Sequence, residues 1–305
     1  MVFSMTDGTK DPIFGQVMAE QNQIPATRTR IIKNLERILG RPVIVYFTSF
    51  NHPVMITDED ADMLEGLLQK MDLSNGLALV INSPGGSGLT AERIIRACRS
   101  YSGTDEYWAI VPNKAKSAAT MVCFGASKIL MGPTSELGPI DPQIKINNNT
   151  FGSAYNVIKS YEDLFDRATK SKGRLEPYLQ QLSNYNEKEI DHLRMIQSLS
   201  EDIAVKTLAN GMMKGISEDD IRSKIQIFLT PEETKTHGRP IYRSDALKCG
   251  LKVEKLDAKD DLWKVIYELY IRMNNYVSGR VSKSIETKTY AYAMPIPKGG
   301  GKNDE

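Results

Sequence analysis

Two short stretches of the sequence bring residue types that could carry acyl-transfer chemistry to turns between a strand and a helix. The first is NSPGGSG at residues 82–88, which follows an apolar run, LALVI, and precedes a helical pattern, LTAERII. A glycine pair in such a turn lets the backbone approach another group closely, because no Cβ stands in the way. The second is NKAKSAATMVCFGAS at residues 113–127, where Ser117 opens a run of small residues. A serine at a helix start is suited to act as a nucleophile, although the same residue can simply cap the helix.

The glycines do not match the two common nucleotide-binding patterns. A phosphate-binding loop of the form GxxxxGK[ST] needs a lysine that NSPGGSG lacks. A dinucleotide site needs GxGxxG, whereas the glycines here are at positions 85, 86 and 88. The turn is therefore either structural or shaped for close approach of another group, such as the oxygen of a reacting carbonyl. These residues alone leave that choice open.

The surrounding pattern predicts the elements that hold these turns. Apolar runs and helical periodicity predict strands at 43–48, 77–82, 107–111 and 127–131, and helices at 26–39, 58–71, 89–101 and 117–126. Such alternation indicates βαβ units around a mostly parallel sheet, whose strands are apolar throughout because both faces are covered. Residues 155–223 carry long helical patterns, and 261–275 predict a last helix. The predicted class is α/β with a helical C-terminal extension.

Composition and charge exclude several classes of function. The chain has 305 residues, of which 41% are hydrophobic and 25% charged, and its net charge of +1 calls for neither nucleic acid nor an anionic membrane as partner. The three cysteines are isolated, so neither a disulfide framework nor a metal site is expected, and no cofactor is predicted. There is no apolar run of about 18 residues and no secretory signal, which favours a cytoplasmic protein without a transmembrane segment.

Four motifs in order, SPGG, KSAAT, LGPIDPQI and HGRPI, resemble the serine dehydrogenase proteinase family, an SppA-like group of Clp/crotonase-fold serine proteases. The resemblance covers roughly residues 26–256. It implies a Clp/crotonase-like fold of repeated ββα/βαβ units, with a helical insertion at 155–223 inside the protease core. On this view 1–25 is a flexible N-terminal segment, 257–285 a C-terminal helix and 286–305 a flexible tail.

The resemblance implies a serine peptidase that hydrolyses peptide bonds through Ser117. The backbone N–H groups of Gly85, Gly86 and Ala118 would form the oxyanion hole, which stabilises the charge that develops when Ser117 attacks a carbonyl. By resemblance the chain is also a homo-oligomer that acts on peptides or unfolded proteins, with subunit contacts through the helical stretch at 155–223. Whether a partner activates it or delivers substrate is left open.

The general base is the least defined member of the site. Clp peptidases place a histidine soon after the serine, but here no histidine lies between residues 53 and 191. SppA-like enzymes use a lysine, and Lys159 lies 42 residues after Ser117 (159 − 117). A lysine acts as base only where burial or nearby cations lower its pKa. His237, with Asp141 as an orienting residue, is the alternative. It ranks below Lys159 because the C-terminal unit of such folds is expected to pack far from the serine.

Two other functions stay open as rivals. The crotonase branch of the fold suggests acyl-CoA chemistry, but those enzymes carry glutamates near the second oxyanion segment, and 113–145 contains Glu136 alone. The missing triad histidine would suit a catalytically silent oligomeric scaffold. Reactivity toward an active-site serine probe separates the peptidase from the scaffold.

Overall fold

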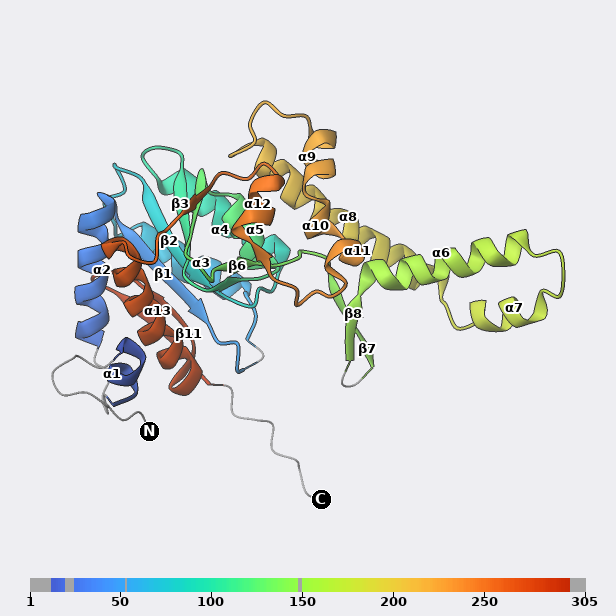
Figure 1. Cartoon of the computed structure of the whole chain (residues 1–305), viewed down its shortest axis with the longest axis horizontal. Helices are drawn as coiled ribbons and strands as arrows, with labels where there is room; N and C mark the ends of the chain where they lie inside the picture. The colour runs from blue at the N-terminus through green and yellow to red at the C-terminus, as the bar shows by residue number, and fades with distance from the viewer. Residues whose placement is uncertain (1–11, 20–24, 53, 148–149, 297–305) are drawn as a thin grey trace, which may run out of the picture.

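The protein is built on one mixed seven-stranded sheet, seen in the computed structural model (Figure 1), which describes residues 12–19, 25–52, 54–147 and 150–296. In spatial order the strands are β10 (Val253–Lys255), β5 (Lys128–Met131), β3 (Tyr107–Val111), β2 (Leu77–Asn82), β1 (Val43–Thr48), β11 (Val281–Glu286) and β12 (Ala291–Pro295). The five strands from β10 to β1 are parallel, whereas β11 and β12 form an antiparallel hairpin beside β1.

Helices cover both faces of the sheet, which explains why its central strands are apolar throughout. One face packs against α3 (Asp58–Leu68), α4 (Gly88–Tyr101) and α5 (Ala118–Phe124), and the other against α2 (Pro25–Leu39) and α13 (Asp261–Gly279). Successive side chains of a strand point to opposite faces of the sheet. Ile44 therefore packs in the core beneath α3, α4 and α5, and Val43 packs in the core beneath α2 and α13. A short helix, α1 (Ile13–Ala19), contacts α13.

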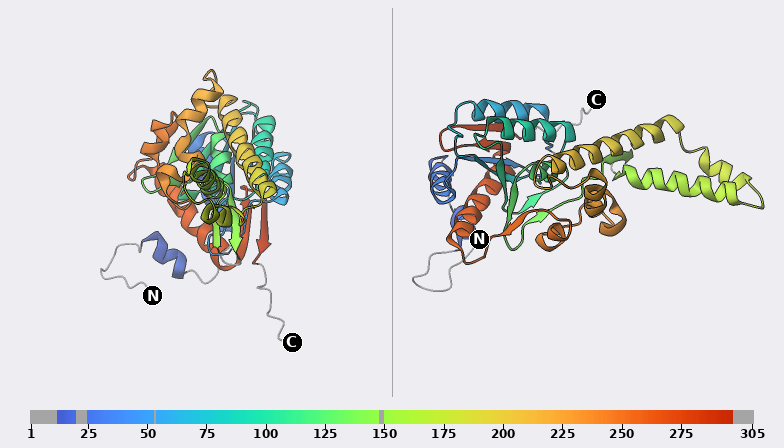
Figure 2. Two further views of the ribbon diagram at one scale, coloured as in Figure 1. Left: turned by 90° about the vertical axis from the view of Figure 1, so that its right-hand side faces the viewer. Right: turned by 90° about the horizontal axis from the view of Figure 1, so that it is seen from above.

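A helical arm extends from this body. It consists of α6 (Ala154–Lys170), α7 (Glu176–Leu182) and the first part of α8 (Glu187–Ala209), and it projects away from the sheet in Figure 1 and in the right-hand view of Figure 2. No residue of α7 is buried. The C-terminal part of α8 returns to the core, where Ile203 and Leu208 are buried. The hairpin of β7 (Gln143–Asn147) and β8 (Thr150–Ser153) leads into α6.

A small second sheet joins three parts of the chain that are far apart in sequence. Its strands are β4 (Lys114–Ala115), β6 (Glu136–Leu137) and β9 (Ile241–Tyr242), in that order. The chain between α8 and β10 also forms four short helices, α9 (Glu218–Lys224), α10 (Gln226–Leu229), α11 (Pro231–Thr234) and α12 (Arg243–Lys248), of which α12 contacts β9. Because β6 pairs with both β4 and β9, the chain that follows β4, the chain that follows β6 and the loop before β9 come to one place.

The predicted α/β class, with its alternating strands and helices, is confirmed. The C-terminal region differs from the expectation of a helix to 285 and a loose tail, because α13 ends at Gly279 and the chain then forms β11 and β12. The polar sequence VSKSIE in β11 does not look like a buried strand, yet Lys283 and Glu286 are buried through ion pairs with Asp60 and Arg28. In the expected N-terminal segment, 13–19 is helical, whereas 1–11 and 20–24, like 297–305 in the tail, lie outside the described residues.

Candidate active site

The Gly85–Gly86 turn lies directly against the segment that carries Ser117. Gly85 has φ +104° and Gly86 has φ +155°, both in the range that favours glycine. A Cβ at Gly85 would lie 2.7 Å from the Cβ of Ser117 and 2.5 Å from the carbonyl oxygen of Lys116, and one at Gly86 would overlap the backbone of Ile56. These glycines are therefore required for close approach, and a larger residue at 85 would displace the serine.

Ser117 has an unusual backbone conformation at the start of α5. Its φ is 50° and its ψ is −122°, and its side chain makes no capping hydrogen bond to the helix. Non-glycine residues seldom adopt positive φ, and such strain in folded proteins is concentrated at functional sites. Backbone hydrogen bonds hold the segment: Ser83 N–H donates to Lys114 O at 2.9 Å, and Lys116 N–H donates to Ser83 O at 3.0 Å. The hydroxyl is thus presented by a rigid turn without being used as a cap.

The three backbone groups predicted to form the oxyanion hole are not equivalent. The N–H of Gly85 donates to the Ser83 hydroxyl oxygen at 3.1 Å. Within the described part of the chain, no acceptor pairs with the N–H of Gly86 or with that of Ala118. Gly86 and Ala118 therefore keep donors that could meet a ligand oxygen, whereas that of Gly85 is already engaged.

His237 lies beside Asp141 and lines the same cavity as Ser117. Its Nδ1 is 2.7 Å from Asp141 Oδ1; the Asp141 side chain is fully buried and that of His237 is 25% exposed. Gln143 Nε2 donates to the other carboxylate oxygen, Asp141 Oδ2, at 2.8 Å, so both oxygens have partners. An imidazole that donates from Nδ1 to a carboxylate keeps Nε2 as a proton acceptor. The geometry is that of an oriented base.

The pairing of β6 with β9 explains how these residues meet. Leu137 lies opposite Ile241 in the register, which brings the loop before β9 to the chain that follows β6. The N–H of Ile140, the residue before Asp141, donates a hydrogen bond to Phe228 O at 2.7 Å. The family resemblance implied that the unit containing His237 lies far from the serine, whereas the small sheet brings this loop to the cavity of Ser117.

The cavity that Ser117 shares with His237 has a volume of about 500 Å³. Its wall is mainly aliphatic, and the described residues give it no lysine, arginine, aspartate or glutamate. The side chains that make it apolar are Met55, Leu89, Met121, Ile140, Ile196, Leu199 and Ile203. The α8 helix supplies the last three, so the arm and the core together form the site.

Lys159 lies elsewhere. It is half exposed on α6, with Nζ 3.8 Å from Oδ1 of Asp163, four residues along the same helix. It lines a polar groove with Tyr155, Glu162 and Arg194, and this groove shares no residue with the cavity of Ser117. The structure therefore brings Ser117, Gly85, Gly86 and His237 together but not Lys159.

Lys116, the neighbour of the serine, is turned into the protein. Its Nζ is 2.8 Å from Glu136 Oε1 and donates to Leu137 O at 3.1 Å. Burial lowers the pKa of Lys116, and the neighbouring Glu136 carboxylate opposes that shift. Since this amine is tied to Glu136 and does not line the cavity, its placement indicates a structural role.

The described residues contain no group of three or more histidine, cysteine, aspartate or glutamate side chains that could hold a metal ion. Cys98, Cys123 and Cys249 are free and buried. Among the helices of the described chain, none has both the length and the apolar character needed to cross a membrane.

Comparison with known proteins identifies a family over the first half of the chain. The profile of the ClpP-like SDH-type serine proteinase family matches residues 14–170. This match includes both glycines, Ser117, Asp141 and Lys159, and ends before His237.

Two relatives are uncharacterized proteins of Methanocaldococcus jannaschii. One is 30% identical over 142 residues, which are 43% of this chain and 49% of the relative. The other is 29% identical over 125 residues, which are 38% and 42% of the two chains. The matched region thus spans about half the length of these relatives or less. A solved structure of a membrane-bound stomatin-specific protease is 16% identical with a TM-score of 0.29, over 38% of this chain and 61% of that one.

Proposed function

Because the chain belongs to the ClpP-like SDH-type serine proteinase family, we propose that it is a serine peptidase with Ser117 as nucleophile, His237 as general base and Asp141 as the residue that orients the base. The observation that carries this proposal is that an imidazole bound to a buried carboxylate lines the same cavity as a serine in a strained, uncapped turn. His237 replaces Lys159 as the proposed base because Lys159 is solvated and lies in a separate groove.

In the proposed reaction Ser117 Oγ attacks the carbonyl carbon of the scissile peptide. The hydroxyl proton passes to Nε2 of His237, and the Asp141 carboxylate stabilises the resulting imidazolium. His237 then gives this proton to the leaving amine, which departs and leaves an acyl ester on Ser117. A water molecule then attacks the ester carbonyl and loses a proton to His237. The bond between the acyl carbon and Ser117 Oγ breaks, His237 returns the proton to Oγ, and the carboxylic acid product leaves.

The N–H groups of Gly86 and Ala118 are the proposed oxyanion donors, since neither has an acceptor within the described residues. Loss of one such donor typically costs about 100- to 1000-fold in rate. Gly85 contributes in a different way, by leaving room for Ser117. The proposed oxyanion hole therefore has two donors, whereas the family resemblance implied three, the N–H groups of Gly85, Gly86 and Ala118.

The aliphatic wall of the cavity supports a preference for peptides with an apolar side chain next to the scissile bond. A charged side chain would lose its water there without gaining a partner, which is costly. Peptides with leucine or methionine at that position should therefore be cleaved at least about tenfold faster than matched peptides with glutamate or lysine. Equal rates across a matched peptide set would contradict the preference.

The arm supports the proposal of a homo-oligomer. It carries exposed apolar side chains far from the sheet, with Leu179 59% and Met195 70% exposed. We propose that these side chains are covered by another subunit, because apolar side chains on a projecting helical arm are well placed for subunit contacts. Leu179→Asp should lower the molar mass measured by light scattering, whereas Ile38→Asp, on α2 of the body, should not.

Labelling with a fluorophosphonate, read by intact mass, tests the proposed function. One adduct on the wild-type protein that Ser117→Ala abolishes would support the nucleophile. A folded, oligomeric wild-type protein that forms no adduct and cleaves no peptide would contradict peptidase activity and favour a scaffold.

A further inference from the structure

Ile56, in a neighbouring segment, binds the Gly85–Gly86 turn through its backbone. The N–H of Ile56 donates to Gly85 O at 2.8 Å, and the N–H of Ser87 donates to Ile56 O at 3.0 Å. The Ile56 backbone also fills the space that a Cβ at Gly86 would need. The position of Ile56 therefore sets the position of the Gly86 N–H, one of the two proposed oxyanion donors.

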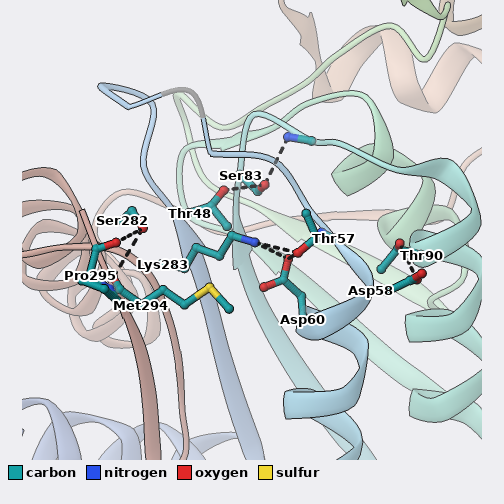
Figure 3. Close-up of polar contacts among 11 residues, drawn as sticks. Thr48, Thr57, Asp58, Asp60, Ser83, Thr90, Ser282, Lys283, Met294 and Pro295 are labelled. Atoms are coloured by element: carbon teal, nitrogen blue, oxygen red, sulfur yellow. Dashed lines mark hydrogen bonds and ion pairs between the residues drawn. The ribbon is translucent and has the colours of Figure 1, made fainter. Parts of the chain in front are cut away.

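Ile56 is in turn anchored through Thr57, the next residue, to a buried ion pair. Thr57 N–H donates to Asp60 Oδ2 at 2.7 Å. Lys283 Nζ donates to the same carboxylate oxygen at 2.7 Å and to Thr57 Oγ1 at 3.1 Å (Figure 3). The exposed fraction is 3% for Lys283 and 0% for Asp60. A buried charge without its partner is strongly unfavourable, so this pair fixes the segment firmly to β11.

A second set of hydrogen bonds links Thr48, the residue opposite Lys283 in the sheet, to the N–H of Gly85. In the register of β1 and β11, Lys283 lies opposite Thr48. Thr48 Oγ1 donates to Ser83 Oγ at 2.7 Å, and that oxygen accepts the N–H of Gly85 at 3.1 Å (Figure 3). Thr48 and Ser83 are fully buried. Lys283 and Thr48, which lie opposite each other on β11 and β1, thus hold the glycine turn through two separate sets of hydrogen bonds. The first set runs through Asp60 and Thr57 to Ile56, and the second runs through Ser83 to Gly85.

We propose that Lys283 is a positioning residue for the oxyanion hole, and that the C-terminal hairpin of β11 and β12 thereby sets the catalytic geometry. This inference rests on the proposed function. Lys283 does not line the cavity, so it acts through Asp60, Thr57 and Ile56. The hairpin lies outside the part of the chain that matches the family profile. On this proposal the C-terminal region of the chain, outside the matched part, helps to position the oxyanion hole.

The test compares Lys283→Met with Arg28→Met. Arg28 forms the matched control pair, because it is bound to Glu286 of the same strand at 2.9 Å, with side chains 2% and 4% exposed, but it holds α2 and not the glycine turn. Both variants should lower the midpoint of thermal unfolding. For Lys283→Met we expect kcat on a leucine-containing fluorogenic peptide to fall about 10- to 100-fold with KM within about threefold. For Arg28→Met, kcat should stay within about twofold, because sites that share no partners are coupled only weakly.

A peptide aldehyde of the same sequence provides a readout that stability alone would not change. It binds as a tetrahedral adduct whose oxygen occupies the oxyanion hole, so its affinity should fall in parallel with kcat in Lys283→Met and stay unchanged in Arg28→Met. Should Lys283→Met fail to fold, the double variant Lys283→Met with Asp60→Asn removes both charges and carries the same expectation.

Equal kcat and equal aldehyde affinity in the two variants would overturn the role of Lys283 while leaving the peptidase activity of the wild-type protein intact. Absence of hydrolysis and labelling in the wild-type protein would instead reject the proposed function, and this inference with it.

Discussion

Lys159 and His237 are the two basic side chains that the sequence offers as partners for Ser117, and they lie in contrasting surroundings. Lys159 is half exposed on the helical arm and faces Asp163, which is 60% exposed. His237 is mostly buried and bound to Asp141, whose side chain is fully buried. A base needs a fixed orientation and a place on the reaction cavity. Lys159 was predicted as the base from its distance in sequence to Ser117, and that distance determines neither the orientation of a side chain nor its place in the cavity.

Replacing each candidate base in turn should give the largest contrast. His237→Ala should lower kcat/KM for peptide hydrolysis by about 10⁴- to 10⁶-fold, because the serine loses its proton acceptor. Lys159→Ala should leave kcat/KM within about twofold, as expected for a surface substitution. Steady-state assays on one fluorogenic peptide compare the two. A severe loss in Lys159→Ala with near-normal His237→Ala would reverse the assignment.

The acidic partners of the two bases offer the next contrast. Asp141→Asn should lower kcat by about 10³- to 10⁴-fold, because an amide at this position neither holds the required tautomer nor stabilises the imidazolium. Asp163→Asn is the matched control at the solvated pair and should have no measurable effect on kcat. Circular dichroism confirms that both variants are folded. An Asp141→Asn variant with full activity would show that His237 needs no orienting carboxylate.

The glycine turn can be compared with a glycine of the arm in the same way. A Cβ at Gly85 meets Ser117 and Lys116, whereas one at Gly173 has no heavy atom within 4 Å. Gly85→Ala should therefore slow fluorophosphonate labelling by about 100-fold, the effect of a small displacement of the nucleophile. Gly173→Ala should label at the wild-type rate. Normal labelling in Gly85→Ala would mean that the turn tolerates a side chain and does not hold the serine.

The smallest expected effect concerns stability. The Lys159–Asp163 pair is exposed, with 3.8 Å between the charged atoms. Lys159→Ala should lower the free energy of unfolding by less than about 0.5 kcal/mol, since exposed pairs four residues apart on a helix contribute little. Urea denaturation measures this. A loss above about 2 kcal/mol would indicate a buried role for Lys159 that exposed ion pairs do not have.

The parallel core and the nucleophile turn are readable from sequence because their signals are local. The runs VIVYFT and LALVIN are apolar at every position or nearly so, as buried strands require, and they form β1 and β2. Gly85 and Gly86 follow the carboxyl end of β2, where parallel sheets present functional groups, and Ser117 follows the short strand β4.

The general base could not be read in this way, because its position depends on pairing between distant segments. β6 and β9 are each two residues long, and no local sequence pattern predicts that Leu137 lies opposite Ile241. The one available signal was the coincidence of an Asp-Pro turn at 141 with a histidine just before a short strand. The same limit applies to β11, where partners far along the chain neutralise the buried Lys283 and Glu286.

The most direct test of the central claim is the labelling rate of Ser117 by a fluorophosphonate in His237→Ala, measured with and without added imidazole. We predict slow labelling that imidazole accelerates, because the small molecule replaces the missing base, while Ser117→Ala stays unlabelled under both conditions. Labelling of His237→Ala at the wild-type rate without imidazole would contradict the assignment of His237 as the base.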